Sequence, residues 1–197
     1  FKVEISPSDG RLVAATTSGL ITSGDRGETW SALGGAPRSG PPDQVQDLSL
    51  SKNPREVFAS GQRGLWRTTD LGNSWQARSE GIFRQSASSI SQSLDGRTLY
   101  LGIPAEGVFR ADLSAPRPAR GLAWTRKSSG LPADPTRARE FQSHVEADRA
   151  EVDKVWNLSS KGLFVSENRG DSWRRVPLDG FSAQHRGGVI EIDPNNP

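Results

Sequence analysis

The sequence predicts an all-β fold built from a repeated unit of four short strands. Hydrophobic residues make up only 33% of the 197 residues, whereas 21 glycines and 13 prolines interrupt the chain, as is typical of many short strands joined by turns. Four tryptophans recur at intervals of 45, 49 and 49 residues, namely Trp30, Trp75, Trp124 and Trp173. Four strands in a unit of about 40 to 50 residues are typical of a propeller blade, so we expect a β-propeller of four-stranded antiparallel blades.

Each repeat contains its four candidate strands in a fixed order. An apolar first strand, such as VQDLSLS, is followed by a turn rich in proline, glycine and charged residues and then by a second strand. The third strand begins at a glycine, and the fourth begins at the recurring tryptophan. Helical spacing of apolar residues is not sustained anywhere. The predicted blades cover residues 1–41, 42–84, 85–138 and 139–186.

The last residues of the chain resemble the first. FKVEISPSD and VIEIDPNNP share alternating apolar positions followed by a proline. We therefore expect residues 187–197 to form the first strand of a fifth blade, within a larger propeller of six or more blades. The chain also begins without methionine and inside a predicted strand, which indicates a mature or excised piece of a longer protein.

A polar motif, S/T-x-D-x-G-x-S/T-W, joins the third strand to the fourth, and we call it the turn motif. It is complete in the first two units, and an amide replaces the acid in the fourth. In the third unit Asp112 is retained, but an insertion before Trp124 removes the glycine from its register. The motif residues are Ser23, Asp25, Gly27, Thr29, Trp30, Thr68, Asp70, Gly72, Ser74, Trp75, Ser166, Asn168, Gly170, Ser172 and Trp173.

Physical chemistry favours a structural role for this motif. A carboxylate two residues before a glycine can accept hydrogen bonds from its own turn, and the glycine supplies the positive φ that a tight hairpin requires. Asn168 preserves an accepting oxygen, whereas a general acid or a nucleophile would not tolerate an amide. The alternative is that the motif is a calcium-binding loop, but it offers only one acid per turn, whereas calcium takes six to eight oxygen ligands.

The motif resembles the Asp-box, or bacterial neuraminidase repeat, and the resemblance covers nearly the whole chain as repeats. Proteins with this repeat include sialidases, xyloglucan-degrading hydrolases, sortilin-type receptors and photosystem II assembly factors. The resemblance implies a propeller but no single function, since these families do unrelated things on one architecture. It also implies an extracytoplasmic location, whether secreted, periplasmic or lumenal.

One loop face carries recurring cations. Loops from the fourth strand of one blade to the first of the next share this face with loops between second and third strands. Cations gathered there could bind carboxylate or phosphate groups of a partner. The same loops hold Glu80, Asp134, Glu140 and Asp179, which favours the alternative of ordinary solvated surface arginines. The candidate partner-binding residues are Arg38, Arg63, Arg84, Arg137, Arg139, Lys161 and Arg186.

Other chemistries find little support in the residues. A net charge of +2 gives no argument for nucleic acid, and no apolar run reaches the roughly 20 residues of a membrane helix. There is no cysteine, and His144 and His185 stand alone in different units, so we predict no metal or cofactor site. The single tyrosine, Tyr100, lies in an apolar strand, where core packing is favoured over the role of a sialidase nucleophile.

We expect a non-catalytic propeller that serves as a protein–protein interaction or complex-assembly scaffold. Its partner would be another protein or a large complex, with a glycan as a second candidate ligand and no direct insertion into membranes. The alternative is a segment of a sialidase-like or xyloglucanase-like glycoside hydrolase. That enzyme would need a pair of carboxylates across a cleft, and nothing marks Asp43, Glu106, Asp134 or Glu140 as such a pair. We therefore predict no catalytic residue.

Overall fold

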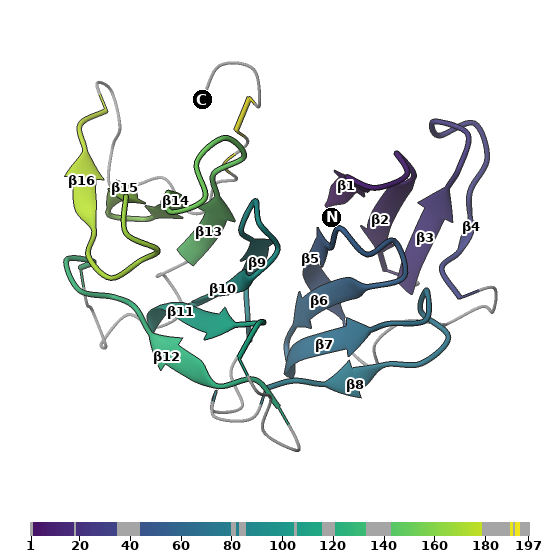
Figure 1. Ribbon diagram of the computed structural model, residues 1–197, viewed down its shortest axis with the longest axis horizontal. Helices are drawn as coiled ribbons and strands as arrows, with labels where there is room; N and C mark the ends of the chain where they lie inside the picture. The colour runs from purple at the N-terminus through teal and green to yellow at the C-terminus, as the bar shows by residue number, and fades with distance from the viewer. Residues whose placement is uncertain are drawn as a thin grey trace. The chain divides into compact units, whose positions relative to one another are not determined.

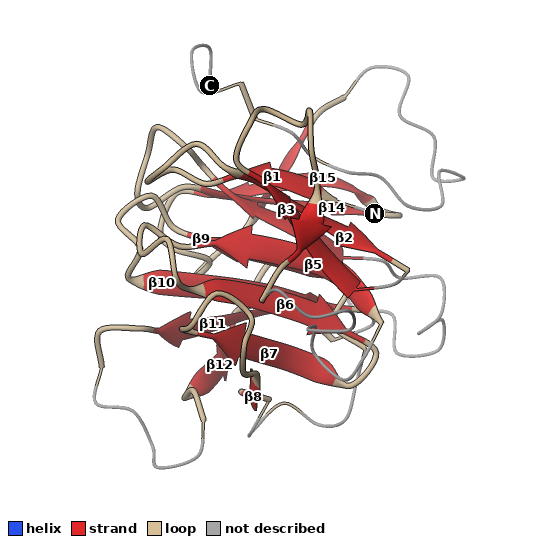
Figure 2. Cartoon of the chain, turned by 90° about the vertical axis from the view of Figure 1, so that its right-hand side faces the viewer, coloured by secondary structure: helices blue, strands red, loops and turns tan. Residues whose placement is uncertain are grey.

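The structure is a computed structural model, and all its regular elements are strands. It describes residues 2–17, 19–34, 44–79, 82, 86–104, 106–115, 121–132, 143–178, 190 and 192–193. These residues form sixteen strands and no helix (Figure 2), which confirms the expected all-β class. It follows that, in this part of the chain, no helix is long and apolar enough to span a membrane.

The strands form four antiparallel sheets of four strands, each connected in chain order (Figure 1), as expected for propeller blades. Blade 1 contains β1 (Val3–Ile5), β2 (Leu12–Thr16), β3 (Gly19–Ser23) and β4 (Ser31–Ala32). Blade 2 contains β5 (Val45–Leu50), β6 (Val57–Gly61), β7 (Gly64–Thr68) and β8 (Gln76–Ala77). Blade 3 contains β9 (Ser89–Gln92), β10 (Thr98–Ile103), β11 (Gly107–Asp112) and β12 (Trp124–Arg126). Blade 4 contains β13 (Ser143–Ala147), β14 (Val155–Ser159), β15 (Gly162–Ser166) and β16 (Arg174–Val176).

The predicted strand order is therefore observed in every repeat. The third strands do begin at the expected glycines, whereas the motif tryptophan precedes the fourth strand by one residue in blades 1, 2 and 4. The predicted first strand of a fifth blade, residues 187–197, falls almost entirely outside the described residues, so it stays a prediction.

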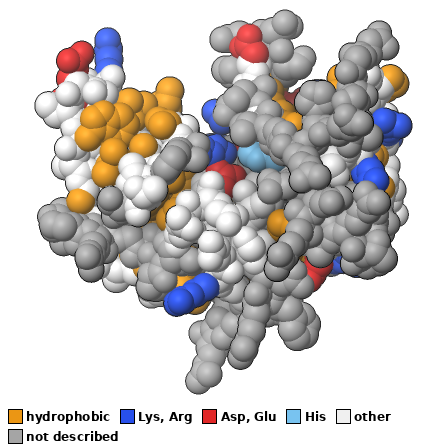
Figure 3. Space-filling view, turned by 180° about the vertical axis from the view of Figure 1, so that it is seen from behind, with side chains coloured by type: hydrophobic (Ala, Val, Ile, Leu, Met, Phe, Trp, Pro, Cys, Tyr) orange, Lys and Arg blue, Asp and Glu red, His pale blue; other side chains and the backbone are white. Residues whose placement is uncertain are grey.

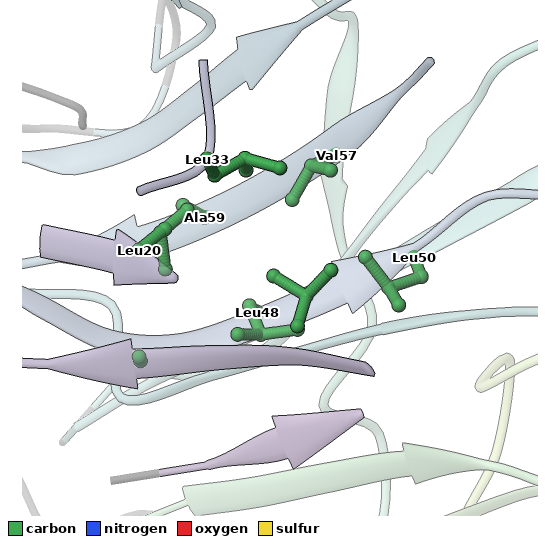
Figure 4. Close-up of a cluster of buried hydrophobic side chains, with 8 residues drawn as sticks. Leu20, Leu33, Leu48, Leu50, Val57 and Ala59 are labelled. Atoms are coloured by element: carbon green, nitrogen blue, oxygen red, sulfur yellow. The ribbon is translucent and has the colours of Figure 1, made fainter. Parts of the chain in front are cut away.

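The chain divides into two compact units, and each contains two blades that pack face to face. Unit 1 comprises residues 1–87 and 119–121, with blades 1 and 2, and unit 2 comprises residues 88–118 and 122–197, with blades 3 and 4. In unit 1 a buried apolar cluster fills the space between the blades (Figure 4). Its residues are Val13, Ala15, Leu20 and Leu33 of blade 1 and Leu48, Leu50, Val57 and Ala59 of blade 2.

Unit 2 has a corresponding cluster between its own blades. Tyr100 and Val108 of blade 3 are buried, and Tyr100 therefore packs in the core as the sequence predicted. Blade 4 supplies the opposite wall from its first three strands and from the turn motif. Its members are Val145, Ala147, Val155, Phe164 and Trp173.

Polar side chains link the first strands of the two blades in each unit. In unit 2, Ser89 Oγ donates to the carbonyl of Ser143 and accepts the N–H of Val145, both at 2.9 Å. Ser91 Oγ accepts the N–H of Ala147 at 3.0 Å. In unit 1 a carboxylate takes this position, because Glu4 Oε2 accepts the N–H of Leu50 at 2.8 Å. These bonds satisfy buried amides that no neighbouring strand of their own blade reaches.

Candidate functional site

The turn motif of blade 1 closes on itself through Asp25. Ser23 Oγ donates to Asp25 Oδ1 at 2.7 Å and accepts the N–H of Gly27 at 2.8 Å. The N–H of Thr29 donates to Asp25 Oδ1 at 2.9 Å, and the Thr29 hydroxyl donates to Oδ2 at 2.5 Å. Both carboxylate oxygens are thus held by the turn itself. These bonds, the Thr29 hydroxyl first, lower the pKa of Asp25 from 3.8 to about 2.

Blade 2 repeats this arrangement atom for atom. Thr68 Oγ1 donates to Asp70 Oδ1 at 2.7 Å and accepts the N–H of Gly72 at 2.9 Å. Ser74 donates its N–H to Oδ1 at 2.9 Å and its hydroxyl to Oδ2 at 2.6 Å. The Ser74 hydroxyl is the main cause that lowers the pKa of Asp70 to about 2.

Blade 4 shows how an amide replaces the acid. Asn168 Oδ1 accepts from the Ser166 hydroxyl at 2.8 Å and from the N–H of Ser172 at 2.9 Å, as the aspartates do. The remaining bond reverses its direction, since Asn168 Nδ2 donates to Ser172 Oγ at 2.9 Å. A hydroxyl can donate or accept, so the same turn closes around either side chain.

Two consecutive residues of each complete motif have positive φ, as in a type I′ hairpin. The glycines do so as expected, with φ of 97° at Gly27 and 86° at Gly72. The residue before the glycine does so as well, with φ of 62° at Arg26 and Leu71 and 56° at Arg169. A residue other than glycine is strained at positive φ. The hydrogen bonds to the acid or amide side chain therefore stabilise this backbone conformation.

The degenerate copy in blade 3 makes a smaller turn. Ser114 donates its N–H and its hydroxyl to Asp112 Oδ1, at 2.8 and 2.6 Å. The pKa of Asp112 is lowered, first by the Ser114 hydroxyl. The carboxylate of Asp112 thus accepts hydrogen bonds from the residue two positions later in the chain. In the complete motifs the carboxylate accepts them from the residue four positions later.

The motif of blade 4 also fastens its blade to the preceding one. The indole N–H of Trp173 donates to the carbonyl of Lys127 at 2.8 Å, and the ring packs in the unit 2 cluster with 6% of the residue exposed. Arg110 Nη1 lies 3.2 Å from Asp171 Oδ1 and donates to the carbonyl of Arg169 at 2.8 Å. In unit 1 the ring of Trp75 likewise packs against the interblade cluster. The motif therefore stabilises both a turn and a blade interface.

A buried charge cluster in unit 1 was not foreseen from the sequence. Lys2 Nζ lies 3.1 Å from Glu4 Oε1 and 3.2 Å from Asp47 Oδ1, on the first strands of blades 1 and 2. Burial raises the pKa of Glu4, against the opposing effects of Lys2 and of the Leu50 N–H. Two carboxylates around one ammonium can serve as an internal ion-pair network or as an acid–base pair. The alternation of charged and apolar residues in KVE was the signal that could have found it.

The predicted cationic face is only partly within the described residues. Arg38, Arg84, Arg137, Arg139 and Arg186 lie outside them. Arg63, between β6 and β7, and Lys161, between β14 and β15, are exposed in the predicted connections. His144 lies in β13, and His185 lies outside the described residues. Among the residues described, no three histidine, cysteine, aspartate or glutamate side chains gather as a metal site would require.

Comparison with known proteins supports the fold. No protein-family model and no curated protein matches the chain. It superposes on an ancestral GH74 enzyme with a TM-score of 0.69 at 18% identity, over 90% of this chain and 24% of the enzyme. For the GH74 xyloglucanase from Xanthomonas campestris the TM-score is 0.60 at 19% identity, over 94% and 30%. For the β-propeller domain of Cps50 (Swd1) from Myceliophteria thermophila it is 0.63 at 11% identity, over 98% and 59%.

These likenesses concern the fold alone. The chain spans less than a third of the length of either GH74 enzyme, and at these identities a shared architecture does not carry a shared chemistry. Together with the four four-stranded sheets, the likenesses confirm the predicted β-propeller fold.

Proposed function

We propose that this propeller is a non-catalytic scaffold that binds another protein or a larger complex. The observation that carries the proposal is the self-contained hydrogen bonding of the turn motif. Both oxygens of Asp25 and of Asp70 are occupied by groups of their own turns, and Asn168 closes the same turn without an acid. The recurring acids of the turn motif therefore have a structural role within their blades. We expect the loops between blades, which vary in sequence, to recognise the partner.

The loop face that contains Arg63 and Lys161 is the proposed contact surface. Both side chains are exposed, and guanidinium and ammonium groups suit carboxylate or phosphate groups on a partner. The cations of the longer loops, which lie outside the described residues, belong to the same proposal. A partner with an acidic surface would associate with a rate that falls as salt is added.

The test is capture of a stable partner by the purified chain from native extract, followed by binding of the purified partner. Charge reversal at two loop positions, R63E with K161E, should weaken binding and flatten its salt dependence. K52E, an exposed change in a turn between first and second strands, is the matched control and should bind normally. Unchanged binding and salt dependence in the double variant would remove the cationic face from the proposal.

A segment of a glycoside hydrolase is the second candidate. One observation favours it, namely the paired carboxylates of Glu4 and Asp47 around Lys2. A buried carboxyl with a raised pKa is what a general acid needs. Hydrolysis of sialosides or β-glucans by the chain, abolished by E4Q or D47N while thermal unfolding is retained, would establish this candidate and overturn the scaffold.

We also propose that the turn motif is a true Asp-box and that the protein works outside the cytoplasm. The support for both is the motif itself, whose pattern of hydroxyl, acid, glycine and tryptophan resembles that repeat. Cell fractionation with an antibody against the chain tests the location. Recovery in the cytoplasmic fraction alone would contradict it.

A further inference from the structure

Charged side chains from both blades of unit 2 meet between blades 3 and 4. On the face of the molecule drawn in Figure 3, basic and acidic side chains of the described residues are scattered rather than gathered in one patch. Between the two blades, in contrast, Arg169 Nε donates to Asp153 Oδ1 at 2.5 Å, and Arg169 Nη2 lies 3.7 Å from Asp95 Oδ2. Arg110 Nη1 donates to the main-chain carbonyl of Arg169 at 2.8 Å. The β9–β10 turn, β11 and the turn motif of blade 4 thus each supply a charged group to one cluster.

The buried hydroxyl of Tyr100 belongs to this cluster. In the β10–β11 ladder Tyr100 lies directly opposite Arg110, so the two side chains are on the same face of blade 3. Burial raises the pKa of Tyr100, and the nearby charges of Arg110 and Arg169 oppose that effect. The side chain is 0% exposed, and among the described residues no group forms a hydrogen bond with its hydroxyl. Because an unsatisfied buried hydroxyl is costly, we expect a polar group to meet it.

The matching positions of unit 1 are uncharged. Val13 holds the position of the tyrosine, and Thr22, its partner on the third strand, holds the position of the β11 arginine. Leu71 replaces Arg169 before the glycine of the turn motif. The hydroxyl and its charged neighbours therefore occur together in unit 2 and are replaced together in unit 1, as expected if they form one polar site.

The gap between Arg169 and Asp95 suits a water molecule. Their separation of 3.7 Å exceeds a direct hydrogen bond, and polar groups at such a distance are commonly bridged by water. Asp95 Oδ1 already accepts the Ser93 hydroxyl at 2.6 Å and the N–H of Arg97 at 3.0 Å, whereas Oδ2 faces the arginine. We propose that the Tyr100 hydroxyl, Arg169 Nη2 and Asp95 Oδ2 together bind an ordered water molecule between blades 3 and 4.

The chemistry of the site favours water over other ligands. Two guanidinium groups face two carboxylates, so the charges balance and a neutral molecule is preferred to an ion. The tyrosine is fully buried, so the ligand is small. A buried water typically makes about three hydrogen bonds, and here the arginine donates, the carboxylate accepts and the hydroxyl can do either. The water links the β9–β10 turn of blade 3 to the turn motif of blade 4. The site is independent of the proposed scaffold role, because it lies inside unit 2 and not on the loop face.

A crystal structure of the purified chain, at a resolution that shows ordered solvent, is the direct test. We expect density for a water oxygen about 2.5–3.2 Å from Tyr100 Oη, from Arg169 Nη2 and from Asp95 Oδ2. A hydroxyl that bonds directly to a protein group, a bound ion in place of water, or no density beside the hydroxyl overturns the proposal.

Thermal unfolding of Y100F tests the same site in solution. Phenylalanine keeps the ring and removes only the hydroxyl, so the water loses one of its three partners. Y100F should therefore unfold about 2–4 °C below the wild type. Removal of a hydroxyl that has no partner would instead leave the unfolding temperature unchanged or raise it, and either result overturns the proposal.

A double-variant comparison tests whether Arg169 shares the water. R169L copies the leucine of blade 2, and because it already removes the water, adding Y100F should lower the unfolding temperature little further. R174L is the matched control, since Arg174 pairs with Glu167 in the same blade and both side chains are exposed. In the R174L background Y100F should have its full effect of about 2–4 °C. Equal effects of Y100F in the two backgrounds would overturn the proposal.

Discussion

Replacing Ser91 by alanine tests the link between the first strands of blades 3 and 4. The Ser91 hydroxyl accepts the N–H of Ala147 at 3.0 Å, and Ala147 is only 3% exposed. The variant therefore leaves a buried amide without an acceptor, which costs about 1–3 kcal/mol. For a chain of this size a loss of about 2 kcal/mol lowers the unfolding temperature by roughly 4–8 °C.

Thermal unfolding followed by circular dichroism measures the loss, and hydrogen exchange at the Ala147 amide locates it. We expect that amide to exchange faster in S91A while the amides of β14 and β15 keep their relative protection. S129A, which removes an exposed hydroxyl in the same unit, should unfold at the wild-type temperature. Wild-type stability and unchanged protection of Ala147 in S91A would refute the idea that side chains join the first strands.

Three further predictions follow from the same geometry. L48A should destabilise unit 1 by about 2–5 kcal/mol in urea unfolding, because Leu48 is fully buried between the blades. V3A, at the matching position of blade 1, should cost less than about 0.5 kcal/mol, because Val3 is 56% exposed; equal losses would contradict this difference in burial. Because the folded chain holds the pKa of Asp25 and Asp70 at about 2, below their unfolded value of 3.8, stability should fall as the pH drops from about 4 to about 2. The D25N/D70N variant should lose less stability over that pH range. A loss of stability equal to that of the wild type would show that these two carboxylates do not cause the pH dependence. G102A should lower the unfolding temperature, since a Cβ at this position of β10 would overlap the carbonyl of Ser143 on β13. Wild-type stability of G102A would show that β10 and β13 can move apart without loss of stability.

Local patterns were enough to predict the strands and the turns. A glycine at the start of each third strand, and the spacing of acid, glycine and tryptophan, depend on interactions within about eight residues, and the sequence displays them directly. The positive φ of Arg26 and Leu71 was missed because nothing in those side chains requires it. It is imposed by the neighbouring acid and glycine, whose hydrogen bonds determine the turn as a whole.

The longer-range features could not be predicted in the same way. Lys2 and Asp47 meet because the first strands of two blades lie side by side, although the two residues are 45 positions apart in sequence. The exposure of Ile5 could not be inferred either, since its apolar character is the same as that of Leu50, which is buried. The cations of the long loops stay a prediction, because these residues lie outside the described part of the chain.

The acid of the turn motif acts as a hydrogen-bond acceptor that closes the turn. The most direct measurement is hydrogen exchange at the Ser74 amide, which donates to Asp70 Oδ1 at 2.9 Å, in D70N and in D70A. Asn168 makes the same bond in blade 4, so D70N should keep the Ser74 amide protected and unfold close to the wild-type temperature, whereas D70A should lose both. Equal loss of protection in the two variants, or wild-type protection in D70A, would contradict the account.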